Sequence, residues 1–476
     1  MTDLLTLPGR PAATLPTGLA CAGCGYVAPA DALPLRCPNA VAGDDIDHVL
    51  RRTLDATRIA WPASGEQNPF VRYRTLFHGY QRAVAAGRDD ADIVAQIESL
   101  DRAVATVDGH GFTVTPLTVA DLGEAGPQVL VKDETRNVSG SHKARHLFGT
   151  LLELRLAGAD DPSRPLAIAS CGNAALAAAV VARAAQRELL VFVPTDADPK
   201  VLERLAQLGA RLTMCERRDD ERGDPTVLRM REALATGAIP FTCQGNENGL
   251  AIEGGLTLGY ELADQWRARG TGVDHLFVQV GGGALASSVI QALEEAKALG
   301  ALDALPRIHA VQTTNTHPLG RAFDLVQARL DQRLAGYLDR ASTLLRAAIA
   351  DGLADEELDW VAHHRSDFMK PWEQVPHSIA SGILDDETYD WLAVVRGMLA
   401  SGGRSVLVDE ETLEQANQIA LAATRIDVDH TGSAGLAGLL ELRRRGAISA
   451  NETCAVLFTG ARRTPKPRQA TLGGYL

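Results

Sequence analysis

The feature that most constrains the fold is an alternation of short apolar runs with longer, alanine-rich segments. Apolar runs at 166–169, 189–193 and 276–280 are each followed by a stretch with helical periodicity. This alternation is typical of parallel β-sheets whose faces are covered by helices. Further strands of this kind are expected at 128–131, 212–214, 308–312, 405–408 and 454–458. The sequence therefore predicts an α/β fold, in which ligands bind beyond the carboxyl ends of the strands.

Charge and composition exclude several classes of protein. Acidic residues outnumber basic ones by 60 to 47, which gives a net charge of -13 and no general attraction to nucleic acid or anionic membranes. Residues 1–10 lack the apolar core of a secretory signal. The apolar segment 166–185 contains Asn173 and Arg183, which marks a core helix and not a membrane span. We expect a cytoplasmic protein that binds neither nucleic acid nor membranes.

The cysteine pattern suggests a remnant of a metal site. The chain has seven cysteines, and an odd number without a secretory signal argues against a disulfide framework. Cys21, Cys24 and Cys37 resemble three quarters of a zinc ribbon. The expected fourth position is Ala40, although His48 is a candidate substitute. We expect a degenerate ribbon that holds no metal.

A lysine lies at the start of a predicted helix. Ser139, Gly140 and Ser141 can cap this helix, which places Lys143 in its first turn. The positive end of the helix dipole favours the neutral, nucleophilic amine that an imine-forming lysine needs. Taken alone, the segment is more typical of a capped surface helix.

Two further glycine-containing segments follow predicted strands. In the segment 170–175, small residues at a helix start form an anion site that suits an amino-acid carboxylate, and Asn173 offers an amide to a phenolic oxygen. In the segment 281–285, consecutive glycine N–H groups form a nest for phosphate. No Gly-Lys-Ser/Thr follows, so this is not a Walker loop. Each segment alone could be a tight turn, and only their combination indicates a site.

In this order, the three segments resemble those of fold-type II pyridoxal-phosphate enzymes, the tryptophan synthase β superfamily. Among these, the chain looks most like threonine synthases and threonine or serine dehydratases, over about residues 70–465. The resemblance implies two parallel-sheet, three-layer domains with an N-terminal extension. We expect the extension at 1–50, a large cofactor-binding domain at 51–144 and 266–476, and a small mobile domain at 145–265.

The resemblance also implies a role for each motif. Lys143 matches the lysine that carries pyridoxal 5'-phosphate as a Schiff base and then removes the α-proton. Asn173 matches the partner of the pyridine 3-oxygen, and Thr459 the hydroxyl opposite the pyridine nitrogen. The implied cofactor-binding residues are Lys143, His142, Asn173, Gly281, Gly282, Gly283, Ala284, Leu285 and Thr459. The implied carboxylate-binding residues are Ser170, Cys171, Gly172 and Asn173.

The substrate is less constrained. Asn248, with Thr257 after it, favours a threonine synthase, as does the ribbon-like segment. Ala251 and Leu256 stand where threonine synthases usually carry cationic residues that would help to hold a phosphorylated substrate. The remaining basic candidates for a phosphate are Lys132, Arg145, Arg72 and Arg74. Lys132 and Asn248 are therefore the predicted substrate residues outside the carboxylate loop.

We therefore expect a threonine-synthase-like lyase or synthase that acts on an amino acid with a β or γ leaving group. A serine or threonine ammonia-lyase, a β-replacement enzyme of secondary metabolism and a non-catalytic cofactor-binding regulator are the alternatives. A homodimer is implied by the habit of the family. Between residues 320 and 376 the alternation lapses, and we expect a helix at 340–350 but assign this insert no role.

Overall fold

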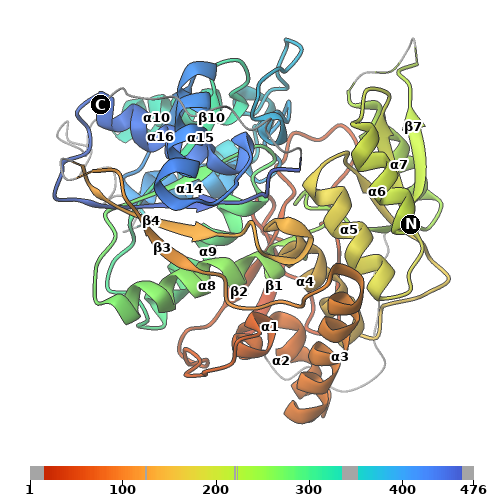
Figure 1. Ribbon diagram of the computed structural model, residues 1–476. Coiled ribbons are helices and arrows are strands. Elements are labelled where there is room, and N and C mark those ends of the chain that lie inside the picture. The colour runs from red at the N-terminus through yellow and green to blue at the C-terminus, as the bar shows by residue number, and fades with distance from the viewer. Residues whose placement is uncertain (1–14, 124–125, 219–220, 222, 335–351, 464–476) are drawn as a thin grey trace.

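The computed structural model describes residues 15–123, 126–218, 221, 223–334 and 352–463, which form two α/β lobes with the N-terminal segment between them (Figure 1). The larger lobe is built on a six-stranded sheet, with all neighbours parallel except β3 and β4. Its strands, in spatial order, are β11 (Ser405–Val408), β10 (Arg307–Thr313), β9 (His275–Gln279), β12 (Thr453–Phe458), β4 (Gln128–Asp133) and β3 (Leu117–Ala120).

Helices cover both faces of this sheet. One face packs against α8 (Ala251–Arg269), α9 (Ala284–Ala298), α10 (Pro318–Leu334), α12 (Asp355–Ala362), α13 (Arg365–Phe368) and α14 (Trp391–Ser401). The other face packs against α15 (Glu410–Thr424) and α16 (His430–Arg444). Strands β9, β12 and β4 are almost wholly buried, as expected of parallel strands covered on both sides.

The smaller lobe is built on a four-stranded parallel sheet in the order β7 (Arg211–Cys215), β6 (Leu189–Pro194), β5 (Leu166–Ala169) and β8 (Ile239–Pro240). Helix α7 (Pro225–Ala235) covers one face. The other face shares a core with α1 (Pro69–Arg72), α2 (His78–Ala85), α3 (Asp90–Asp108), α4 (Lys143–Leu156), α5 (Asn173–Ala184) and α6 (Pro199–Gln207).

The predicted strands of both sheets are present, and 166–169 and 405–408 have the expected bounds. The expected two-sheet α/β fold is confirmed. The helices at 69–108 share one buried core with the smaller sheet and also with residues of α8 and α9 from the larger lobe. The predicted domain boundary at 265/266 lies inside the continuous helix α8.

The N-terminal extension reaches past residue 50. It forms an antiparallel hairpin in which β1 (Thr17–Cys21) pairs with β2 (Leu50–Leu54). The insert after residue 320 contains helices α10, α12 and α13, while the helix expected at 340–350 lies outside the described residues. In the described part of the chain, no helix has the length and apolar character needed to cross a membrane.

Candidate active site

Lys143 is the first residue of α4, in agreement with its predicted place in the first helical turn. Its side chain is half-buried. The chain reaches it from β4 through the short 3-10 helix Val138–Gly140. A bridge pairs Ser141 with Gly460, and the backbone N–H of His142 donates to the Thr459 carbonyl at 3.2 Å. These contacts hold Lys143 beside the carboxyl end of β12.

The helix start is not capped as predicted. His142 occupies the N-cap position, and no side chain of the cap accepts a helix N–H. Ser139 adopts a left-handed conformation, with φ at 58°. The hydroxyls of Ser139 and Ser141 are buried and have no hydrogen-bond partner among the described residues. A buried polar atom without a partner costs about 1–3 kcal/mol, so these hydroxyls are suited to a bound ligand.

His142 presents a third unpartnered atom. Its Nδ1 lies 3.2 Å from the Thr459 carbonyl oxygen, which can only accept, so the Nδ1–H donates. Its Nε2 is buried and lacks a partner within the described part of the protein. Burial lowers the pKa of His142 well below its ordinary value, and the charge of Lys143 lowers it further. The ring is therefore neutral, and Nε2 is an acceptor turned away from the Thr459 carbonyl.

The glycine loop is built to bind an anion. Gly281–Gly283 connects the central strand β9 to α9, and Gly283 begins that helix with φ at 98°. A Cβ at position 281 would lie 2.3 Å from Asp385 Oδ2, so a side chain does not fit. The N–H of Gly282 donates to the Asp385 carboxylate. The Gly282 N–H therefore points to an anionic oxygen, and N–H donors in a glycine turn are suited to binding anions.

Asn173 is the first residue of α5, on the opposite lobe. Its Oδ1 accepts hydrogen bonds from the guanidinium of Arg463, with the Nε donor at 3.0 Å. Its Nδ2 lies beside Gly460 and would be 2.8 Å from a Cβ there. The guanidinium can only donate, so it fixes the orientation of the amide. The NH₂ group of Asn173 is therefore available to an anionic oxygen such as that of a pyridine ring.

Thr459 follows β12 and is fixed by Gln279 at the end of β9. The Nε2 of Gln279 lies within 3.1 Å of the carbonyl oxygens of Gly432 and Leu457, which defines the NH₂ end of the amide. The same nitrogen donates to Thr459 Oγ1 at 2.7 Å. The Thr459 oxygen is therefore an acceptor toward Gln279, and its own O–H is left to donate to a ligand.

The loop at 170–172 lies between β5 and α5, as predicted, and is half-buried. Burial raises the pKa of the Cys171 thiol, and the charges of Asp196, Asp224 and Asp385 raise it further. Burial also raises the pKa of Asp385 to about 6, although the charge of Lys143 and the Gly282 N–H oppose that shift. Acidic side chains therefore lie around both Lys143 and the loop at 170–172.

The two other predicted substrate residues do not reach this site. Lys132 is fully buried and pairs with Glu261 at 2.6 Å, below the cleft end of β4. Asn248 is also fully buried, and its side chain bonds to Thr150, to the Thr242 carbonyl and to the Leu250 N–H. Their polar atoms are used inside the protein, so we assign both a structural role.

The remaining basic candidates are also occupied. Arg145 forms buried ion pairs with Glu134 and Glu261. Arg72 pairs with Asp264, and Arg74 with Asp90. These arginines are therefore engaged by carboxylates and do not supply a phosphate site.

Sequence reasoning missed Arg463, Gln279 and Asp385. Gln279 carries the clearest signal, because it is a polar residue near the end of a buried strand that leads into three glycines. Arg463 lies four residues after the predicted Thr459, and Asp385 lies in a loop without a strand before it. The sequence carries no comparable signal for these two.

Comparison with known proteins agrees with this site. The profile of the family described as pyridoxal-phosphate dependent enzyme matches residues 110–460. A threonine synthase of Methanocaldococcus jannaschii is 22% identical over 339 residues, which is 70% of each chain. An L-serine dehydratase of Saccharomyces cerevisiae is 27% identical over 194 residues, covering 38% of this chain and 56% of the relative.

Solved structures share the fold. A threonine deaminase from T.th. superposes with a TM-score of 0.55 at 22% identity, covering 78% of this chain and 99% of that one. A diaminopropionate ammonia lyase of Escherichia coli superposes with a TM-score of 0.54 at 16% identity, covering 77% and 88%. The family profile spans most of the chain and the site has the donors that the cofactor needs. The chain is therefore a member of the pyridoxal-phosphate-dependent enzymes of fold type II, similar to threonine synthases and dehydratases, and its cofactor is pyridoxal 5'-phosphate.

Proposed function

We propose that this enzyme catalyses elimination or replacement at the β or γ carbon of an amino acid, with Lys143 as the cofactor-binding and proton-transferring residue. One observation carries the proposal. The Lys143 amine, the Asn173 NH₂ group and the Thr459 hydroxyl come from three separate segments, and the latter two are held as donors by Arg463 and Gln279. This is the donor set that a pyridoxal ring requires.

The bound cofactor supplies an electron sink that stabilises negative charge at the substrate Cα. Lys143 is placed to take up and return the α-proton through its amine. Asn173 would donate to the ring 3-oxygen, and the glycine loop would bind the phosphate. Thr459 would donate a hydrogen bond to the pyridine nitrogen but, as an alcohol, would not transfer its proton at neutral pH. A ring held in this way would store less charge, which would favour loss of a leaving group over transamination.

The electrostatics of the site bear on the leaving group. The pKa of Cys171 is raised by the charges of Asp385, Asp224 and Asp196. The basic residues suggested by the sequence form ion pairs inside the protein, away from Cys171. The glycine loop offers N–H donors to the cofactor phosphate, but a second phosphate, on the substrate, would meet these carboxylates with every predicted basic partner already paired, whereas a hydroxyl or an amine needs no such partner. We therefore favour an ammonia-lyase-type elimination on a substrate with a neutral or cationic leaving group over a synthase acting on O-phosphohomoserine.

A product assay on the holoenzyme tests this preference. We expect ammonia and a keto acid from serine, threonine or 2,3-diaminopropionate, and no phosphate from O-phosphohomoserine. A Lys143→Ala variant should give neither product. Phosphate release from O-phosphohomoserine would instead support a threonine synthase and contradict the assigned leaving group.

The same assay separates the other candidate functions. A β-replacement enzyme would release little ammonia alone and would need an added nucleophile, whereas a non-catalytic regulator would bind the cofactor without product. We also retain the expectations of a cytoplasmic enzyme and of a homodimer. Light scattering on the purified holoenzyme would test the dimer directly.

A further inference from the structure

We propose that Cys21, Cys24, Cys37 and His48 bind one zinc ion, which locks the N-terminal hairpin onto the helices that carry the glycine loop. The four candidate ligand atoms all lie within 4.8 Å of one another. Cys21 and Cys37 are buried, and Cys24 and His48 are half-buried. The site is separate from the cofactor site and is supplied by the segment that the sequence marked as a degenerate ribbon.

The distances match a tetrahedral zinc site. With Zn–S bonds of about 2.3 Å and a Zn–N bond of about 2.0–2.1 Å, tetrahedral geometry requires S···S near ~3.8 Å and S···N near ~3.6 Å. Cys24 Sγ lies 3.6 Å from Cys37 Sγ, and Cys21 Sγ lies 3.6 Å from His48 Nδ1. A disulfide would need about 2.05 Å between sulfurs, so Cys24 and Cys37 are not joined.

Backbone N–H groups surround the three sulfurs. Cys21 accepts from the N–H groups of Gly23 and Cys24, with the latter at 3.5 Å, while Cys24 accepts from Tyr26. Cys37 accepts from the N–H of Asn39. The turns leave no room for larger residues, because a Cβ at Gly23 would lie 2.3 Å from the Asp47 carbonyl oxygen. These N–H groups surround the sulfurs with donors that a metal-bound thiolate, which is the form that binds metal, could use.

The fourth ligand is already oriented. His48 Nε2 lies 3.1 Å from the Asp44 carboxylate, so this nitrogen carries the proton and donates it. His48 Nδ1 is then left with a free lone pair that faces Cys21. A carboxylate that holds the outer nitrogen of a histidine is a common second layer around zinc. His48 therefore replaces the ribbon position filled by Ala40, and the expectation of a metal-free remnant is revised on this geometry.

The metal would fix the hairpin at both ends of its long connection. Cys21 ends β1, and His48 lies two residues before β2. Next to His48, the buried Asp47 accepts from Trp391 Nε1 at 3.0 Å, at the start of α14. The residue before Trp391, Asp390, donates its N–H to the Gly282 carbonyl at 3.1 Å. Two hydrogen bonds, Trp391 to Asp47 and Asp390 to Gly282, therefore connect the proposed zinc site to the glycine loop.

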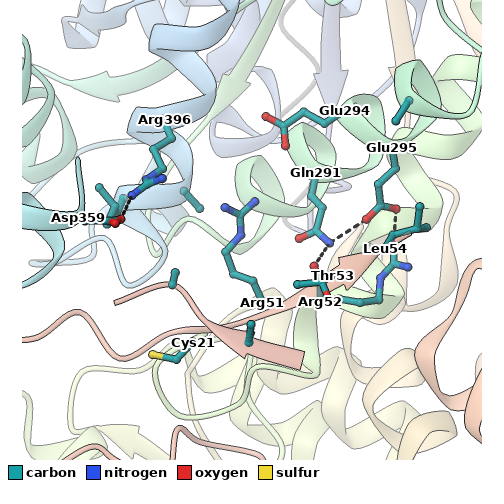
Figure 2. Close-up of a pocket in the computed structure, with 15 residues that line it drawn as sticks. Cys21, Arg51, Arg52, Thr53, Leu54, Gln291, Glu294, Glu295, Asp359 and Arg396 are labelled. Atoms are coloured by element: carbon teal, nitrogen blue, oxygen red, sulfur yellow. Dashed lines mark hydrogen bonds and ion pairs between the residues drawn. The ribbon is translucent and has the colours of Figure 1, made fainter. Parts of the chain in front are cut away.

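Strand β2 makes a second connection, to α9. Arg52 pairs with Glu295 and Glu253, and its carbonyl accepts from Gln291 Nε2 at 2.9 Å. Figure 2 shows the contacts of Arg52 with Glu295 and Gln291 beside a cavity of about 440 Å³ that lies between the hairpin and helices α9 and α14, with Cys21 on the hairpin side. A metal ion would therefore add a cross-link within the hairpin to the contacts that Arg52 and Asp47 already make with the larger lobe.

Metal analysis of the full-length holoenzyme tests the proposal without relying on activity. We expect about one zinc per chain after dialysis, and Cys24→Ser, Cys37→Ser and His48→Ala variants should each lose most of it. Cys215→Ser, which alters a buried cysteine outside the cluster, is the matched control and should keep its zinc. Zinc below about a tenth of an equivalent in the wild-type chain, with three reactive thiols or a Cys24–Cys37 disulfide, would overturn the proposal.

Cobalt substitution covers the case in which a variant does not fold. Wild-type chain loaded with Co²⁺ should show thiolate-to-metal charge-transfer bands and the intense d–d bands of a tetrahedral site. Verified removal of the metal should lower Tm by about 5 °C, because a ligand that binds only the folded chain stabilises it. Weak octahedral bands, or a Tm unchanged after metal removal, would contradict the site or its locking role. Neither result bears on the reaction assigned to Lys143.

Discussion

Arg463 Nε lies 3.0 Å from Asn173 Oδ1, and this contact across the two lobes decides which end of the Asn173 amide faces the cofactor site. Arg463→Ala removes a charge-assisted hydrogen bond worth roughly 1.5–3 kcal/mol and frees the amide to rotate. We expect the Kd for pyridoxal 5'-phosphate to rise roughly 10- to 100-fold. An absorbance titration of the apoenzyme measures this. Arg445→Ala, at an exposed pair with Glu441, is the control, and equal Kd values for both variants would contradict the role.

Thr459 accepts from Gln279 and is left to donate its own proton. Thr459→Asp replaces this donor with a carboxylate that would hold a proton on the pyridine nitrogen. We expect the visible absorbance of the bound cofactor to shift and transamination to appear as a side reaction. Thr459→Ser keeps the hydroxyl and should keep the spectrum. If the Asp variant has the wild-type spectrum, Thr459 does not face the ring nitrogen.

Asp385 accepts from the Gly282 N–H, which is one of the donors that we propose for the cofactor phosphate. Burial raises the pKa of Asp385 to about 6, so the carboxylate is charged above that pH and opposes a phosphate dianion. We expect Asp385→Asn to bind pyridoxal 5'-phosphate about tenfold more tightly than wild type at pH 8, with the difference vanishing near pH 5. The phosphate of the cofactor takes up a proton in the same pH range, which weakens the repulsion in the wild type alone and adds to the loss of the difference. A ratio that is constant with pH would exclude this competition.

Three buried histidines should make the fold sensitive to acid. Burial lowers the pKa of His78, His146 and His309 to about 3, against an ordinary value of 6.5. Between these values the unfolded chain binds more protons than the folded one, so stability is present above pH 6.5 and is lost as pH falls toward 3. Thermal midpoints from pH 7 to 4.5 should therefore decline.

The test is the slope of the thermal midpoint against pH, because many groups affect the midpoint at any single pH. His309→Phe removes one of the three groups, in a stack with Phe277 that an aromatic ring can maintain. This variant should lower the free energy of unfolding at pH 7 by about 1 kcal/mol, because the hydrogen bond to His275 is lost. It should also make the thermal midpoint fall less steeply as the pH is lowered. A decline as steep as in wild type would show that His309 is not titrating.

Much of the fold follows from local patterns in the sequence. The strands at 166–169 and 405–408 are short apolar runs between helices, and period and length suffice to place them. The hairpin at 17–21 and 50–54 was not predicted, because its partners are far apart and neither strand is continuously apolar. Its position depends on tertiary contacts that no local pattern encodes.

The site divides in the same way. Lys143, Asn173, Thr459 and the glycine loop occur where strands end and helices begin, so motif and topology place them together. Lys132 has the same kind of position at a strand end, yet Glu261 from α8 draws it into the interior. Whether a charged residue faces a cleft or a buried partner depends on the neighbouring helix, which the motif does not show.

The central claim is that Lys143 carries the cofactor. Borohydride reduction of the holoenzyme, followed by peptide mapping, tests it most directly. We predict one equivalent of label on the peptide that contains Lys143, and none in a folded Lys143→Ala variant. A label on another lysine, or a wild-type chain that binds the cofactor but takes up no label, would contradict the account.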